Sequence, residues 1–179
     1  MPLVLLIGGA RSGKSELALR LASEQSSPGA FLATAQAGDK EMAARIAQHR
    51  RERPDSWQTI EESLRLREAI VDVNDDHCLV IDCLTLWTAN ALEAFGADQV
   101  GAYATAAAHA AAARTGLTVA VTNEVGLGIV PDNALARSYR DLLGRVNAIW
   151  AEAADQVYLL VAGRALALAK TDSLSGRLQ

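Results

Sequence analysis

The feature that most constrains this chain is a phosphate-binding pattern near its start, of the form GxxxxGK[ST]. An apolar run over residues 3–7 precedes the pattern, and leucines at helical spacing follow it. Between a strand and a helix, the glycines let successive backbone N–H groups point at an anion, and the dipole of the helix adds positive charge there. A glycine turn that binds nothing is the alternative, and the agreement of strand, loop and helix makes it the weaker one. The residues are Gly8, Gly9, Ala10, Arg11, Ser12, Gly13, Lys14 and Ser15.

Two side chains of this loop and one strand-end carboxylate indicate phosphoryl chemistry. Lys14 can reach the β- and γ-phosphates of a nucleoside triphosphate as a catalytic point charge, and the Ser15 hydroxyl can ligate Mg²⁺. Asp82 follows the apolar residues 79–81, and strand-end aspartates commonly supply a carboxylate to the metal ion of phosphate-loop proteins. A solvated strand-end aspartate would look the same. We predict that Ser15 and Asp82 bind Mg²⁺.

Alternation of strand-like and helical patterns predicts an α/β fold, namely a P-loop NTPase whose mostly parallel sheet is flanked by helices. Strands are expected over residues 3–7, 30–34, 78–81, 117–122 and 157–161. Helices are expected over 14–24, 39–54, 64–73, 86–94, 98–114 and 135–154, and the alanine-rich fifth of these should pack closely. The tail after Gly163 is expected to end as a polar segment. With 179 residues, half of them apolar, we expect residues 1–179 to form one catalytic nucleotide-binding domain.

Charge and hydropathy exclude two classes of partner. The formal net charge of −4 argues against a protein that binds nucleic acid through a general excess of basic residues. No apolar run approaches the length that crosses a bilayer, and the first apolar run leads into the phosphate loop instead of a cleavage site. The sequence therefore predicts a cytoplasmic protein without a membrane span.

His49 lies in an arginine-rich segment of the second expected helix. Arg45 and Arg53 stand four residues before and after it and share its helical face. Like charge disfavours the imidazolium form, so His49 would stay neutral and nucleophilic while the arginines bind phosphate oxygens. Taken alone, a histidine among arginines is more often a solvated surface residue.

Polar residues also follow the second and fourth expected strands, at the edge where parallel α/β sheets bind ligands. The second strand leads to Thr34, Ala35 and Gln36, and the fourth leads to Asn123 and Glu124. These residues could face the substrate, or they could be polar strand caps next to a flexible loop. The pattern does not decide between these interpretations.

Over nearly its whole length the chain resembles the bifunctional adenosylcobinamide kinase/adenosylcobinamide-phosphate guanylyltransferase family of cobalamin biosynthesis. The phosphate loop is shared by many families, whereas the segments around His49 and around Asn123 are specific in combination. The matching segments are 8–15, 33–36, 41–46 with His49, 53–54 with 57–61, 82–85, 122–131 and 144–147. The short polar end after Lys170 departs from the family pattern.

This resemblance implies a two-step enzyme with a RecA-like core that assembles as a homotrimer. ATP or GTP would phosphorylate the terminal hydroxyl of adenosylcobinamide, with Mg²⁺ as cofactor. His49 would then attack the α-phosphorus of GTP, expel pyrophosphate and pass GMP to adenosylcobinamide phosphate. The implied GTP contacts, besides the phosphate loop, are Thr34, Ala35, Gln36, Arg50, Arg51, Glu52, Arg53, Glu61 and Asp82.

Two other functions remain compatible with the residues. One is a small-molecule or nucleotide kinase without guanylyl transfer, in which His49 and the arginines only bind phosphate. The other is a nucleotide-gated RecA-like module that acts through a protein partner. The guanine motif NKxD of GTPase switches does not occur in the sequence.

Overall fold

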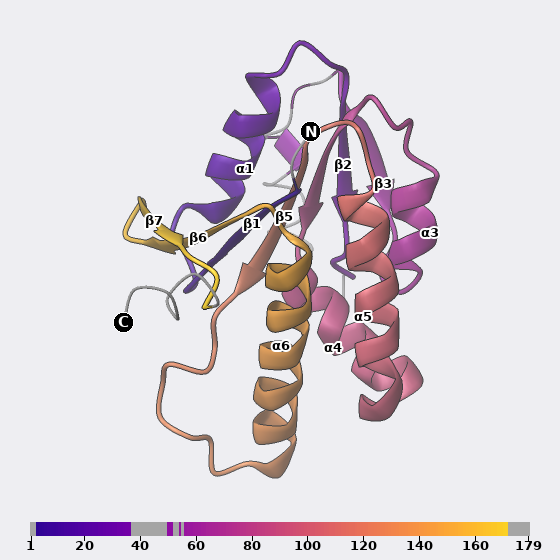
Figure 1. Cartoon of the computed structure of the whole chain (residues 1–179). Coiled ribbons are helices and arrows are strands. Elements are labelled where there is room, and N and C mark those ends of the chain that lie inside the picture. Colours follow the sequence, from indigo (N-terminus) through magenta and orange to yellow (C-terminus); the bar gives the residue numbers. More distant parts are fainter. Residues whose placement is uncertain (1–2, 37–49, 52–53, 55, 172–179) are drawn as a thin grey trace.

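The computed structural model describes residues 3–36, 50–51, 54 and 56–171. A seven-stranded sheet in the order β3-β2-β4-β5-β1-β6-β7 runs through the centre of the molecule (Figure 1). All neighbouring strands are parallel except β6 and β7. The expected α/β fold with a mostly parallel sheet is confirmed. The strands are β1 (Leu3–Gly8), β2 (Gly29–Ala33), β3 (Gln58–Glu61), β4 (Cys78–Asp82), β5 (Thr118–Asn123), β6 (Gln156–Val161) and β7 (Arg164–Leu168).

Helices cover both faces of the sheet, and their side chains form two apolar clusters with alternate strand residues. On one face α1 covers β1, β4 and β5. The other face packs against the remaining helices, which also pack on one another. The helix expected over 39–54 lies largely outside the described residues. The helices are α1 (Lys14–Ser23), α3 (Leu66–Val71), α4 (Leu84–Phe95), α5 (Ala97–Ala112) and α6 (Ala134–Ala153).

The alanine-rich helix α5 packs closely, as expected from its sequence. It lies between α3 and α6, and its buried face consists of one valine and four alanines. Small side chains let the backbones of neighbouring helices approach, so this helix contributes to the core through proximity instead of side-chain volume. The buried residues are Val100, Ala104, Ala107, Ala108 and Ala111.

Two strands at the edges of the sheet were not expected from the sequence. β3 is short, lacks a buried run, and extends the sheet by pairing with β2. No strand was expected after Gly163, yet β7 pairs antiparallel with β6 there, and the end of the tail expected to be polar lies largely outside the described residues. The turn between them contains Ala162 and Gly163 with φ of 50° and 73°, and two-residue hairpin turns require such positive φ values.

Among the described residues no helix is both long and apolar enough to span a bilayer.

Candidate active site

The phosphate loop connects β1 to α1 at the carboxyl edge of the sheet. Gly13 directly precedes α1 with a φ of 94°, a left-handed conformation that glycine adopts without a steric penalty. A side chain at Gly8 would collide with the backbone carbonyl of Leu160 in β6. The two glycines therefore serve different purposes, since Gly13 permits the turn and Gly8 permits the close approach of β6.

Lys14 is 6 % exposed and folds back along the loop that precedes it. Its Nζ donates to the carbonyl oxygens of Gly8 at 3.0 Å and Gly9 at 2.7 Å, and to the Ser12 hydroxyl at 3.3 Å. Burial lowers the pKa of Lys14, and the charge of Asp82 opposes this shift. The ammonium group is thus held at the loop by weak, neutral acceptors that phosphate oxygens can replace.

Asp82 and Ser15 are the two predicted ligands of a cation at this loop. Asp82 ends β4, two strands from β1, and its charge acts on Lys14. Ser15 lies in the first turn of α1 and is half-buried. Within the described part of the chain, no cluster of three or more His, Cys, Asp or Glu side chains could hold a metal ion. One carboxylate and one hydroxyl oxygen are a suitable protein ligand set for Mg²⁺, because this ion takes its other ligands from phosphates and water.

The exit of β5 lies directly beside the phosphate loop. The backbone N–H of Glu124 donates to the Gly8 carbonyl at 3.1 Å, the same oxygen that accepts a bond from Lys14. The Glu124 carboxylate also accepts a hydrogen bond from the Gly126 N–H. Asn123 and Glu124 therefore lie beside the phosphate loop.

The hairpin turn between β6 and β7 also supports the phosphate loop, through a residue that the sequence analysis did not single out. The Gly163 N–H donates to the Ser12 carbonyl at 3.1 Å. The signal that could have revealed it is the Ala162-Gly163 pair between two short apolar runs, which is typical of a tight hairpin.

Thr34 lies at the end of β2, where its side chain forms hydrogen bonds with the backbone of Cys83. Its hydroxyl accepts a hydrogen bond from the Cys83 N–H at 2.9 Å and donates to the Cys83 carbonyl at 2.7 Å. Gln36 is exposed and donates from Nε2 to the Ser63 hydroxyl at 2.6 Å. Since the Thr34 hydroxyl is occupied, any contact of this segment with nucleotide falls to Ala35, Gln36 or the backbone.

A second group of charged side chains lies at the carboxyl end of β3, the outermost strand on that side of the sheet. Arg50 and Glu61 form an ion pair with an N···O distance of 3.8 Å, and Arg51 is exposed next to them. Glu61 ends β3, which is four strand spacings from β1, or roughly 19 Å. The predicted residues of the described part of the chain therefore lie along the carboxyl ends of neighbouring strands, from the phosphate loop at β1 past Asp82 at β4 and Thr34 at β2 to Glu61 at β3. His49, Glu52 and Arg53 lie outside the described residues.

Comparisons with known proteins agree with this arrangement. Residues 4–168 match the family described as cobinamide kinase / cobinamide phosphate guanyltransferase. The bifunctional adenosylcobalamin biosynthesis protein CobP of Pseudomonas aeruginosa is 42% identical over 160 residues, covering 89% of this chain and 92% of that protein. The bifunctional adenosylcobalamin biosynthesis protein CobU of Escherichia coli is 40% identical over 175 residues, covering 90% and 96%.

A likeness to a solved structure concerns the fold alone. A prototypical ATPase from the type III secretion system of pathogenic bacteria superposes with a TM-score of 0.59 at 12% sequence identity. The match covers 99% of this chain and 61% of the length of that ATPase. The arrangement of the sheet and its helices therefore also occurs in that ATPase.

Proposed function

Because this chain belongs to the cobinamide kinase / cobinamide phosphate guanyltransferase family, we propose that it catalyses two consecutive steps of adenosylcobalamin biosynthesis. The first step phosphorylates adenosylcobinamide with ATP or GTP. The second transfers GMP from GTP to adenosylcobinamide phosphate and releases pyrophosphate. The single observation that carries the proposal is the phosphate loop with Lys14 buried against it and Asp82 close enough to influence its pKa, in a chain that matches this family over residues 4–168.

In the first step the residues of the loop bind and orient the triphosphate. Loop N–H groups and the start of α1 receive the phosphate oxygens, and Lys14 exchanges its bonds to Gly8 and Gly9 for the β- and γ-phosphates. Ser15 and Asp82 would hold Mg²⁺, which neutralises charge on the triphosphate when it is bound. The acceptor hydroxyl approaches from the side of Asn123 and Glu124. Positioning and charge neutralisation suffice for such a transfer.

In the second step we assign the nucleophile to His49. A nitrogen of the imidazole forms a bond to the α-phosphorus of GTP while the bond to pyrophosphate breaks. The phosphate oxygen of adenosylcobinamide phosphate then attacks the same phosphorus, and the histidine leaves unchanged. The charged pair of Arg50 and Glu61 at β3 supports a GTP site of which Arg51, Glu52 and Arg53 are further members.

We further propose that the protein works as a cytoplasmic homotrimer, as the family resemblance implies. Sedimentation equilibrium of the purified full chain measures this directly. A mass of three chains is expected, and a stable monomer at enzyme concentrations that support activity would contradict it.

Labelling with α-phosphate-labelled GTP tests the proposed function. A nitrogen–phosphorus bond to imidazole is cleaved by acid and survives alkali, so the wild type should carry an acid-labile label after denaturing electrophoresis. His49→Ala should carry no label and should keep the phosphorylation of adenosylcobinamide, because transfer to a hydroxyl needs no histidine nucleophile. His109→Ala, on the exposed side of α5, is the matched control and should label like the wild type.

The outcomes separate the proposal from its two alternatives. A wild type that phosphorylates adenosylcobinamide without taking up label would be a plain kinase. A wild type that binds nucleotide and does neither reaction would be a nucleotide-gated module. Label on His49→Ala would place the guanylylated residue elsewhere in the chain.

A further inference from the structure

We propose that three buried side chains, Thr85, Thr122 and Asn147, are positioning residues that fix Asn123 and Glu124 on the acceptor side of the phosphate loop. The inference deepens the proposed function and rests on it, since the acceptor is the cobinamide hydroxyl. These side chains come from α4, β5 and α6, and their exposed fractions are 8 %, 0 % and 6 %.

Asn147 binds the end of β5 with both ends of its amide group. Its Oδ1 accepts a hydrogen bond from the Thr122 hydroxyl at 2.7 Å, and its Nδ2 donates to the Asn123 carbonyl at 3.0 Å. The two bonds fix the orientation of the amide, because the Asn123 carbonyl can only accept and so requires the amide nitrogen on its side. Helix α6 thereby determines the direction in which the chain leaves β5.

Thr85 completes the arrangement from the first turn of α4. Its hydroxyl accepts a hydrogen bond from the Asn123 N–H at 2.7 Å and lies 3.5 Å from the Thr122 hydroxyl. Its carbonyl accepts a bond from the Tyr139 hydroxyl of α6 at 2.9 Å. Both backbone polar groups of Asn123 are thus bound by side chains of two helices.

The next residue along the chain transmits this placement to the phosphate loop. The Glu124 N–H binds the Gly8 carbonyl, to which the Lys14 ammonium also donates. A shift of Asn123 would therefore move the acceptor side of the site relative to Lys14, and small displacements of reacting groups cost large factors in rate.

Thr118 shows that a buried threonine on this strand face does not need such partners. It lies four residues before Thr122, so both side chains point to the same face of the sheet, and it is 1 % exposed. Among the described residues its hydroxyl has no hydrogen-bond partner. The hydrogen bonds of Thr122 are therefore specific to the carboxyl end of β5, which lies beside the phosphate loop, and are absent for Thr118 at the amino end among the described residues.

The test compares Thr122→Val with Thr122→Ser and with the matched control Thr118→Val. For Thr122→Val we expect kcat/KM for adenosylcobinamide in the phosphorylation step to fall about tenfold, because a buried amide loses its donor and the β5 exit shifts. The KM for the triphosphate should stay within about twofold, since the loop and Lys14 are intact. Thr122→Ser keeps the hydroxyl and should therefore have the kcat/KM of the wild type. Thr118→Val should also have the kcat/KM of the wild type.

Several outcomes would overturn the inference. These are wild-type kinetics in Thr122→Val, an equal loss in Thr118→Val, or a loss that follows only the folded fraction measured by circular dichroism. If Thr122→Val does not fold, Thr85→Val and Thr85→Ser give the same comparison through the bond to the Asn123 N–H. A wild type that does not phosphorylate adenosylcobinamide would instead refute the proposed function.

Discussion

Lys14 and Arg114 are equally buried, each 6 % exposed, yet they lie at opposite ends of the sheet and hold different kinds of partner. Lys14 donates to the phosphate loop, whose backbone is itself a binding site for anions. Arg114 donates to backbone carbonyls of residues 70–77, at the end of α3 and in the loop that leads to β4. Burial alone therefore does not mark a cationic side chain as functional. The groups that accept its hydrogen bonds are the better guide.

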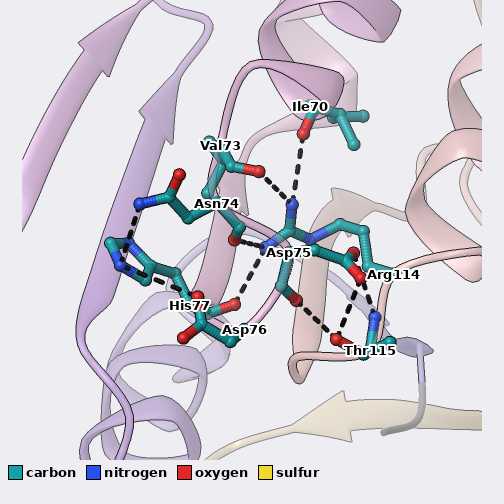
Figure 2. A network of polar contacts seen from close by, with 8 residues as sticks. All are labelled: Ile70, Val73, Asn74, Asp75, Asp76, His77, Arg114 and Thr115. Atoms are coloured by element: carbon teal, nitrogen blue, oxygen red, sulfur yellow. Dashed lines mark hydrogen bonds and ion pairs between the residues drawn. The ribbon is translucent and has the colours of Figure 1, made fainter.

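The bonds of Arg114 connect two loops at the amino end of the sheet (Figure 2). Its Nη1 donates to the carbonyls of Ile70 at 3.2 Å and Val73 at 2.9 Å, at the end of α3. Its Nη2 donates to the carbonyls of Asn74 and His77, both at 2.9 Å. The guanidinium thus closes a helix end that would otherwise leave carbonyls unsatisfied.

A second contact between the same loops lies at the surface. The Thr115 N–H and hydroxyl both donate to the Asp75 carboxylate, and these bonds lower the pKa of Asp75 (Figure 2). These bonds connect the end of α3 to the segment before β5, whereas Arg114 Nε and His77 Nδ1 have no hydrogen-bond partner among the described residues. Substitutions at the two ends should separate stability from catalysis.

Lys14→Ala should give the largest effect. We expect both activities to fall by about a thousandfold or more, because one phosphate loop serves the triphosphate in either step. The melting temperature should change little, since Lys14 holds only the loop. Purified protein is assayed for phosphorylation and for GMP transfer. Full phosphorylation by the folded variant would show that the loop is not the catalytic nucleotide site.

Arg114→Met should give the opposite result. We expect the free energy of unfolding to fall by about 2–4 kcal/mol, because the carbonyls at the end of α3 lose a buried donor. Activity per folded molecule should equal that of the wild type. Urea unfolding measures the first quantity, and kcat below the transition measures the second. If Arg114→Met kept its stability and lost its activity, the assignment of the amino end to stability and of the carboxyl end to catalysis would be wrong.

Asp82→Asn should raise the Mg²⁺ concentration for half-maximal phosphorylation by about tenfold, because an amide is a weaker ligand than a carboxylate for a hard cation. Asp75→Asn makes the same change at the amino end and should leave the Mg²⁺ dependence as it is. Metal titrations of both variants at fixed triphosphate decide the matter. Identical titration curves for Asp82→Asn and wild type would assign Asp82 to a structural role.

The features that the sequence predicts well are local. The phosphate loop is a contiguous pattern, and the central strands are apolar runs, so the α/β fold and the place of Lys14 in the loop follow from order along the chain. β7 was missed because a weak alanine and leucine alternation becomes a strand only through the turn at Ala162 and Gly163. Its edge position lets it form with all five residues exposed.

Contacts between distant segments could not be predicted from the sequence. Arg114 meets carbonyls of residues 70–77, and Asn147 meets Thr122 and Asn123, only because strand order brings these segments together. Strand order also places the ion pair of Arg50 and Glu61 at β3, four strand positions from the phosphate loop. The family resemblance implies that both this pair and the loop contact GTP. Strand order is a property of packing and is not encoded in any short pattern.

Thr118→Val should give the smallest effect, and its sign is informative. The Thr118 hydroxyl is buried at the amino end of β5 without a hydrogen-bond partner among the described residues, so a methyl group of the same shape removes a desolvation cost. We expect the free energy of unfolding to rise by about 1 kcal/mol, whereas Thr122→Val at the other end of the strand should lower it by a similar amount. Urea unfolding of both variants, with equal m-values, gives the comparison. A loss of stability in Thr118→Val would mean that this hydroxyl is satisfied in solution, and the two ends of β5 would then be alike.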